Sequence, residues 1–130
     1  MVLTAYSECA ILVSYLIPSR GGMAWTVDIH PDVMKFIGKY LSPDDKVLVL
    51  ELFDRLEIHG TNLGRPYTRQ IEGKLWELRP QTTQGTWRFL YIAAPEQRFF
   101  LVVGMRKRKR ITEEMKRTAY NRLSFFEEGG

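Results

Sequence analysis

In the first well-patterned part of the chain, apolar residues first alternate as in a strand and then recur at helical spacing. Residues 25–30 (WTVDIH) alternate apolar and polar side chains, which predicts a short, half-buried strand. Pro31 suits the first position of a helix, and apolar residues then recur at helical spacing through residues 33–41. A second helix is predicted to start at residues 42–43, with a capping serine and a proline, and to stop at Gly60. The short link between the two helices predicts an antiparallel pair.

Three strands are predicted in the second half of the chain, after a loop at residues 61–73. Residues 74–79, 87–93 and 98–104 are short segments rich in apolar and aromatic side chains. The connections between them are short and turn-like, so we expect the three strands to pair antiparallel as a meander.

A last helix is predicted after Thr112, which can cap it, and two glutamates occupy its first turn. Its inward stripe would consist of Met115, Ala119, Leu123 and Phe126. The resulting order is β-α-α-β-β-β-α. It predicts an α+β fold: a small, mostly antiparallel sheet with two N-terminal helices and a C-terminal helix, all on one face of the sheet.

Residues 1–22 differ from the rest of the chain and carry no chemistry that we can identify. Their apolar run at residues 10–17 is far shorter than the roughly 20 residues that a membrane span needs. A secretory signal would begin with basic residues, but Glu8 is the first charged residue. We therefore expect residues 1–22 to be an extension upstream of a natural start at Met23, and residues 23–130 to form one domain.

The composition is typical of a folded domain in a reducing compartment. The chain has 130 residues, of which 45% are hydrophobic, and this is enough for a core. Its single cysteine, Cys9, excludes an intrachain disulfide and a thiolate metal cluster. Neither His30 nor His59 has a second metal-ligand residue at helical spacing. We expect no metal, no cofactor and a cytoplasmic location.

Positive charge is concentrated in the second half of the chain. The formal net charge is +4. Residues 23–64 carry 4 Lys and Arg against 7 Asp and Glu, whereas residues 65–130 carry 14 against 7. This asymmetry indicates a face that contacts phosphate.

The densest part of that charge is the basic run RKRKR at residues 106–110. Such a run can be a solvated loop or a nuclear import signal. An import signal is normally an accessible extension, however, and this run links the last predicted strand to the last predicted helix. Its position beside the sheet therefore favours contact with phosphate.

Two arginines on neighbouring predicted strands are candidates for the same role. Strand periodicity places Glu77 and Arg79 on one face of their strand, and Arg88 lies near the start of the next strand. In a tight hairpin Arg79 and Arg88 lie close together, and they repel each other unless an anion or a carboxylate lies between them. Glu77 could be that carboxylate, which would make Arg79 a structural ion pair. Alternatively, at least one arginine holds phosphate through its planar guanidinium.

The order of these motifs resembles a known family. GKLWELR, then TWRFLY, then an apolar strand ending in G-M-R-K and a C-terminal helix resemble the RelE/ParE superfamily of bacterial toxins, in particular its HigB-like, phage-derived branch. The resemblance covers residues 23–126. It implies a RelE-like fold and the toxin of a type II toxin–antitoxin system, usually an endoribonuclease that cleaves mRNA in the ribosomal A site.

The resemblance also assigns roles to individual residues. Arg79 matches the arginine that ends the ELR strand. Arg88 matches the arginine of an R-x-x-Y strand, which contacts the scissile phosphate in the nuclease branch. Arg106 and Lys107 match the basic residues after the last strand, where the family keeps catalytic or phosphate-binding groups.

RNA cleavage without a metal uses the 2′-hydroxyl as nucleophile and needs a base, an acid and stabilisation of the phosphorane. Arg88 and Arg106 suit the phosphorane because they stay charged, and Glu77 is the candidate base. Lys107 or Lys74 could be the acid if neighbouring cations lowered its pKa. Further contacts with RNA or phosphate are expected from Arg79, Lys74, Arg108, Lys109, Arg110 and Tyr67, the last by stacking on a base.

Three functions stay open at this point: a ribosome-dependent mRNA endoribonuclease, a ParE-like inhibitor of DNA gyrase, and a non-catalytic, phage-derived RNA-binding domain. The resemblance implies two partners, a small helix-turn-helix antitoxin and mRNA on the ribosome. We expect no membrane partner.

Overall fold

The computed structural model describes residues 25–106 and 110–127. The prediction about residues 1–22 lies outside these ranges. Within them, no helix is both long and apolar enough to cross a membrane.

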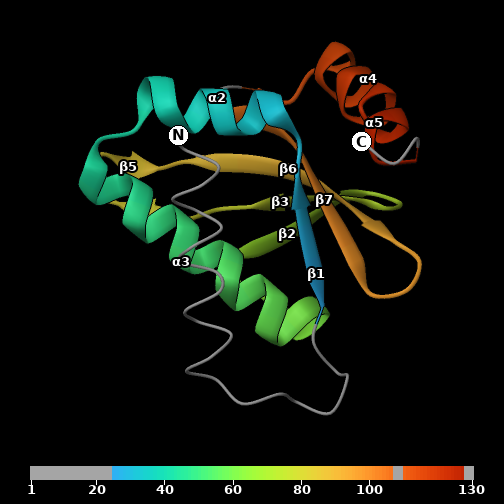
Figure 1. Cartoon of the computed structure of the whole chain (residues 1–130), viewed down its shortest axis with the longest axis horizontal. Coiled ribbons are helices and arrows are strands. Elements are labelled where there is room, and N and C mark those ends of the chain that lie inside the picture. Colours follow the sequence, from blue (N-terminus) through green and yellow to red (C-terminus); the bar gives the residue numbers. More distant parts are fainter. Residues whose placement is uncertain (1–24, 107–109, 128–130) are drawn as a thin grey trace.

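A five-stranded sheet with the order β1-β7-β6-β3-β2 forms the centre of the domain (Figure 1). β7 pairs parallel with β1, and the other neighbours pair antiparallel. β3, β6 and β7 are the predicted meander, which the structure confirms. The strands are β1 (Thr26–Ile29), β2 (Thr68–Glu72), β3 (Leu75–Leu78), β6 (Arg88–Ala94) and β7 (Arg98–Met105).

The structure adds strands where the sequence predicts loops. β2 occupies much of the predicted loop at residues 61–73, and it is an edge strand whose side chains are mostly exposed. A strand of this kind shows no apolar alternation, so the pattern does not reveal it. A small hairpin, β4 (Gln81–Thr82) and β5 (Gly85–Thr86), fills the connection from β3 to β6.

Both predicted N-terminal helices are confirmed, and so is the predicted Ser42 cap of the second. They are α2 (Pro31–Tyr40) and α3 (Pro43–His59), followed by a short 3-10 turn, η1 (Gly60–Asn62). The His30 side chain accepts a hydrogen bond from the Asp32 N–H, and the Ser42 hydroxyl accepts one from the Asp45 N–H. These bonds satisfy helix N–H groups that otherwise have no intrahelical acceptor.

The predicted C-terminal helix is also present, but it is interrupted. Thr112 caps α4 (Glu113–Asn121), Arg122 is its C-terminal capping residue, and α5 (Leu123–Glu127) continues the segment. The four residues of the predicted inward stripe do contact the core: Met115, Ala119, Leu123 and Phe126.

The prediction that all helices cover one face of the sheet is wrong. α2 and α3 pack on the face that carries Leu78, Phe89 and Leu101. α4 and α5 pack on the opposite face, which carries Leu75 and Leu90 (Figure 1). Because the central strands are apolar on both sides, each face buries its side chains only under a helical layer of its own.

Candidate nucleic-acid interface

A buried carboxylate, that of Glu77, organises the most highly charged part of the sheet. Glu77 lies on β3 and is 0% exposed. Arg69 pairs directly with it across β2 and β3, and the register of β3 with β6 brings the ends that carry Arg79 and Arg88 together. Strand alternation turns all three arginine side chains to the Glu77 face. We refer to Arg69, Glu77, Arg79 and Arg88 as the arginine cluster.

The three arginines contact Glu77 at different distances. The Arg88 Nε donates a hydrogen bond to Glu77 Oε2. An Arg69 nitrogen, Nη2, lies 3.3 Å from Oε1. The Arg79 Nε lies 3.9 Å from Oε1, which is an ion pair but is too long for a hydrogen bond. Arg88 is therefore the arginine that is most closely held.

The arginine cluster carries more positive charge than Glu77 can neutralise. Three guanidinium groups face one carboxylate, and side-chain exposure rises from 14% at Arg88 to 40% at Arg79 and 46% at Arg69. The Arg79 Nε is buried and has no hydrogen-bond partner among the described residues. The cluster can thus bind an anion from solvent through its two outer arginines, while Glu77 and Arg88 hold the arrangement in place.

The predicted role of Glu77 as a general base does not fit this position. Its side chain is 1% exposed, and both carboxylate oxygens face arginines. A general base must come within hydrogen-bond reach of the substrate hydroxyl, and here the arginines occupy the approach to the carboxylate. Of the alternatives that the sequence leaves open, the structure favours Glu77 as the carboxylate that lies between the arginines.

Arg106 does not join the arginine cluster. Arg88 pairs with Met105, whose side chain lies in the core beneath α4, so Arg106 as the next residue turns to the other face. There its guanidinium carbon lies 4.4 Å from the centroid of the Tyr40 ring. The predicted joint action of Arg88 and Arg106 on one phosphate is therefore not what this geometry provides.

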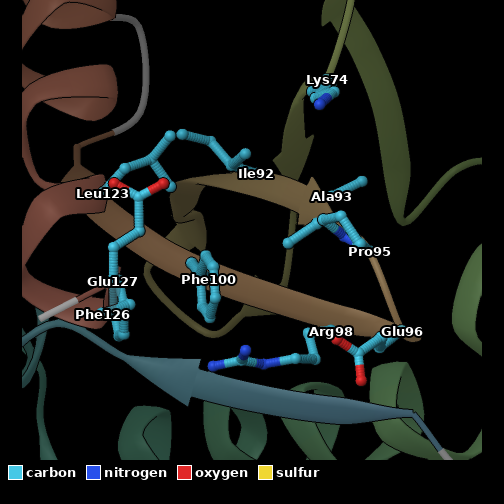
Figure 2. Close-up of a pocket in the computed structure, with 11 residues that line it drawn as sticks. Lys74, Ile92, Ala93, Pro95, Glu96, Arg98, Phe100, Leu123, Phe126 and Glu127 are labelled. Carbon is cyan, nitrogen blue, oxygen red and sulfur yellow. The ribbon is translucent and has the colours of Figure 1, made fainter. Parts of the chain in front are cut away.

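Lys74 lies at the opposite end of β3 from the arginine cluster. It precedes β3, whereas Arg79 follows it, and the five residue steps between them span about 16 Å of extended chain. Lys74 borders a pocket of about 260 Å³ between the β6–β7 turn and α5, where Phe100 stacks on Phe126 (Figure 2). The structure thus separates Lys74 from the phosphate site for which it was a candidate.

The other predicted site residues contribute no side chain to the contacts described for the arginine cluster. Tyr67 borders the cluster through its backbone, because its carbonyl accepts a hydrogen bond from the Arg79 N–H at 2.8 Å, but its side chain turns away. Tyr67 packs against the core on the α3 side, with the Arg55 guanidinium carbon 5.2 Å from its ring centroid. Arg110 is exposed. Lys107, Arg108 and Lys109 lie outside the described residues.

Arg69 is the member of the cluster that sequence reasoning misses. The signal that identifies it is Gly73, which has a φ of +46° and forms the tight turn from β2 to β3. A glycine turn directly before a predicted strand indicates a hairpin, and pairing across that hairpin sets Arg69 opposite Glu77. No cluster of three or more His, Cys, Asp and Glu in the described part of the chain could hold a metal ion.

Comparison with protein families identifies the family of this chain. The model of the family described as phage-derived protein Gp49-like (DUF891) matches residues 39–124, which is more than half of the chain. The chain belongs to the Gp49-like family. The part of the Gp49-like domain that matches includes the whole arginine cluster as well as Tyr40 and Arg106.

The fold of this Gp49-like protein is that of the RelE toxins. A mutant of the Escherichia coli toxin RelE in the free state superposes with a TM-score of 0.56 and 13% sequence identity, over 78% of this chain and 99% of that chain. At such low identity the likeness shows the fold alone. None of the curated proteins matches this chain. The family and the fold together confirm the predicted place of the chain in the RelE superfamily.

Proposed function

We propose that this Gp49-like protein is the toxin of a toxin–antitoxin pair and that it acts in the cytoplasm as a ribosome-dependent mRNA endoribonuclease. The observation that supports this function is the excess of positive charge in the arginine cluster, where three guanidinium groups share one buried carboxylate. RNA offers the matching ligand, a phosphate that passes through a more highly charged phosphorane during cleavage.

In this proposal the cluster stabilises the reacting phosphate without a metal. The 2′-hydroxyl attacks the adjacent phosphorus, the 5′-oxygen leaves, and the product is a 2′,3′-cyclic phosphate. Arg69 and Arg79 donate to the phosphate oxygens that gain charge, and Glu77 and Arg88 hold the arrangement in place. The proton transfers would fall to groups other than Glu77, and Lys107 remains the predicted acid.

A second candidate function, RNA binding without cleavage, is favoured by the position of Glu77. The carboxylate that the sequence offers as a base is 0% exposed and is engaged by arginines. A protein with the arginine cluster alone would hold RNA and would not cut it. The two functions make the same prediction for RNA binding and opposite predictions for RNA cleavage.

Controlled expression in a bacterial host distinguishes these functions. The wild-type protein is induced, growth is followed, and mRNA 5′ ends are mapped. Cuts in phase with codons support the endoribonuclease. Intact mRNA with a DNA-damage response indicates a gyrase inhibitor, and intact mRNA with normal growth indicates a non-catalytic domain. Either of the last two results overturns the proposed cleavage.

A matched pair of arginine variants tests whether the cluster is the active part. Arg79 and Arg98 have side-chain exposures of 40% and 43%, and each forms one ion pair, with Glu77 and with Asp28. We expect Arg79→Gln to lower the cleavage rate by about 100-fold, the usual effect of losing one donor to a transition-state anion. Arg98→Gln should cleave as the wild type does. Equal rates for the two variants would argue against the cluster.

The proposed antitoxin partner can be tested in the same system. We expect a small helix-turn-helix protein encoded beside the toxin to restore growth when the two are expressed together. Restoration should accompany a stable complex in gel filtration, because the antitoxin acts by binding.

A further inference from the structure

A second basic surface lies on the other face of the sheet, beside the end of α2. Its centre is Tyr40, which is 36% exposed and lies under the Arg106 guanidinium. Tyr40 and Arg106 line a cavity of about 300 Å³ together with Gln84, Thr86 and Trp87. That volume is at the lower end of the range for small-molecule pockets. We refer to these five residues as the Tyr40 pocket.

The Tyr40 pocket combines an aromatic ring with two nearby cations. The Lys39 Nζ lies 5.3 Å from the centroid of the Tyr40 ring, and the Arg106 guanidinium carbon lies 4.4 Å from it. Exposed aromatic rings next to arginine and lysine are the features on which unpaired bases stack while their phosphates are neutralised.

The charge around the pocket is positive as well. A groove that shares Tyr40 continues along α2 and is lined by Lys35, Lys39 and Arg122, with Asp32 as its one carboxylate. Asp32 is already engaged, since Arg122 lies 2.9 Å and Lys35 3.9 Å from its oxygens. The groove therefore keeps a surplus of cations that suits a polyanion.

The walls of the pocket offer groups that can read the edge of a base. Gln84 is exposed and carries an amide with donors and an acceptor. Thr86 contributes a hydroxyl, which donates to the Gln81 side chain at 2.9 Å and can still accept. Trp87 is 7% exposed, and its indole N–H is engaged by Asp45, so it supplies an apolar wall.

The Tyr40 pocket and the arginine cluster lie at the same end of the sheet, on opposite faces. Arg88 pairs with Met105, and Arg106 is the next residue along β7. A single RNA strand that leaves a phosphate on the arginine cluster would reach Tyr40 by passing around this end. A double helix is too wide to contact both faces in this way.

We propose that the Tyr40 pocket binds one unpaired nucleotide of single-stranded RNA next to the nucleotide whose phosphate lies on the arginine cluster. The base stacks on the Tyr40–Arg106 platform, and Lys39 neutralises the attached phosphate. This assignment rests on the proposed recognition of RNA and adds a separate site to it. It does not require that the RNA be cleaved.

The site can be tested with an RNA probe that the protein cannot cut. A short 2′-O-methyl RNA lacks the nucleophilic hydroxyl, and single 5-iodouridines placed along it crosslink to aromatic side chains on irradiation. We expect one position to crosslink to Tyr40 or Trp87, as mapped by mass spectrometry. Crosslinks that never reach either residue would overturn the proposal, whether or not the protein cleaves mRNA.

Binding of the same probe by variants gives an independent measurement. We expect Tyr40→Ala to weaken binding by about tenfold, the effect of losing one stacked base, and Tyr40→Phe to keep wild-type affinity. Tyr120→Ala is the matched control, because Tyr120 is 37% exposed and lies on α4. Equal affinities for Tyr40→Ala and Tyr120→Ala would contradict the site, as would full competition by a polyaspartate peptide.

The two proposals fail in different ways. A protein that crosslinks at Tyr40 but leaves cellular mRNA intact keeps the nucleotide site and loses the nuclease function. Suppose instead that the wild type shows no crosslink at Tyr40 and that the Tyr40→Ala variant cuts mRNA at the wild-type rate. The nuclease function is then kept and the nucleotide site is lost.

Discussion

Glu77 and Asp45 are both buried carboxylates with 0% exposure, yet their partners differ in kind. Glu77 faces three arginines. Asp45 lies in the first turn of α3 and accepts hydrogen bonds from neutral groups: the hydroxyls of Thr82 and Thr83, each at 2.9 Å, and the Trp87 indole at 3.2 Å.

The difference decides what each carboxylate can do. Burial alone would raise the pKa of Asp45, but the hydrogen bonds from Trp87, Thr82 and Thr83 hold it below its usual value. Asp45 stays charged without a cationic partner among these donors, and its hydrogen bonds link the β4–β5 hairpin to α3. Glu77 is paired with three arginines, so a net positive charge remains around it. A buried carboxylate with neutral donors is structural, whereas one outnumbered by cations prepares a surface for an anion.

The largest effect that tests this comparison is expected from Glu77→Gln. The substitution leaves three guanidinium groups close together without a counter-charge, so the free energy of unfolding should fall by about 3–5 kcal/mol, as for other broken buried ion pairs. Denaturation in urea measures it. Inorganic phosphate at constant ionic strength should raise the Tm of this variant more than that of the wild type. A variant that is as stable as the wild type would show that Glu77 does not hold the arginines.

A smaller loss is expected from Asp45→Asn. The new amide group faces donors, so at least one hydrogen bond is lost and the favourable charge at the start of α3 disappears. Together these changes should lower the free energy of unfolding by about 2 kcal/mol. Asp44→Asn is the control, because Asp44 is exposed in the same turn. Added phosphate should not rescue Asp45→Asn. A rescue equal to that of Glu77→Gln would remove the distinction between the two sites.

A third prediction concerns two partly buried carboxylates, Glu57 and Asp54, and it varies pH instead of the buried carboxylate. Burial raises the pKa of Glu57 to about 7 and that of Asp54 to about 6, and the repulsion among Asp28, Glu51 and these two residues adds to it. The folded state then binds protons more tightly than the unfolded state. Stability should therefore fall as the pH rises from about 4.5 to 7, the interval between the usual and the raised pKa of Glu57.

The measurement is the Tm at several pH values in that interval. Glu57→Gln should remove most of the decline, because the neutral side chain can still accept the hydrogen bond that the Val27 N–H donates at 3.4 Å. Glu96→Gln changes an exposed glutamate in the β6–β7 turn and should keep the decline. A wild-type Tm that does not change over this interval would mean that the carboxylates are solvated.

Much of the fold could be predicted from periodicity and capping residues. Ser42 starts α3 and Thr112 starts α4, and the alternation around Trp25 marks β1. β2 escaped prediction because an exposed edge strand has no apolar period. The face of the sheet that α4 covers could not be predicted either. The sheet is apolar on both faces, so the apolar stripe of α4 would fit either one.

The candidate site could be predicted only in part. Glu77, Arg79 and Arg88 were recognisable because alternation on two neighbouring strands places them on one face. Arg69 required the pairing of β2 with β3. Lys74 and Arg106 carry the right charge, but charge does not specify which end of a strand or which face of a sheet a residue occupies.

Residue order and residue type are enough to predict the local elements, the basic second half and the family. The position of Glu77 between the arginines, and of Arg106 against Tyr40 on the other face, follows from the folded sheet alone. Both outcomes depend on strand register, and a shift of one residue in a strand moves a side chain to the opposite face. Register is set by the packing of the whole sheet between two helical layers, which no single segment contains.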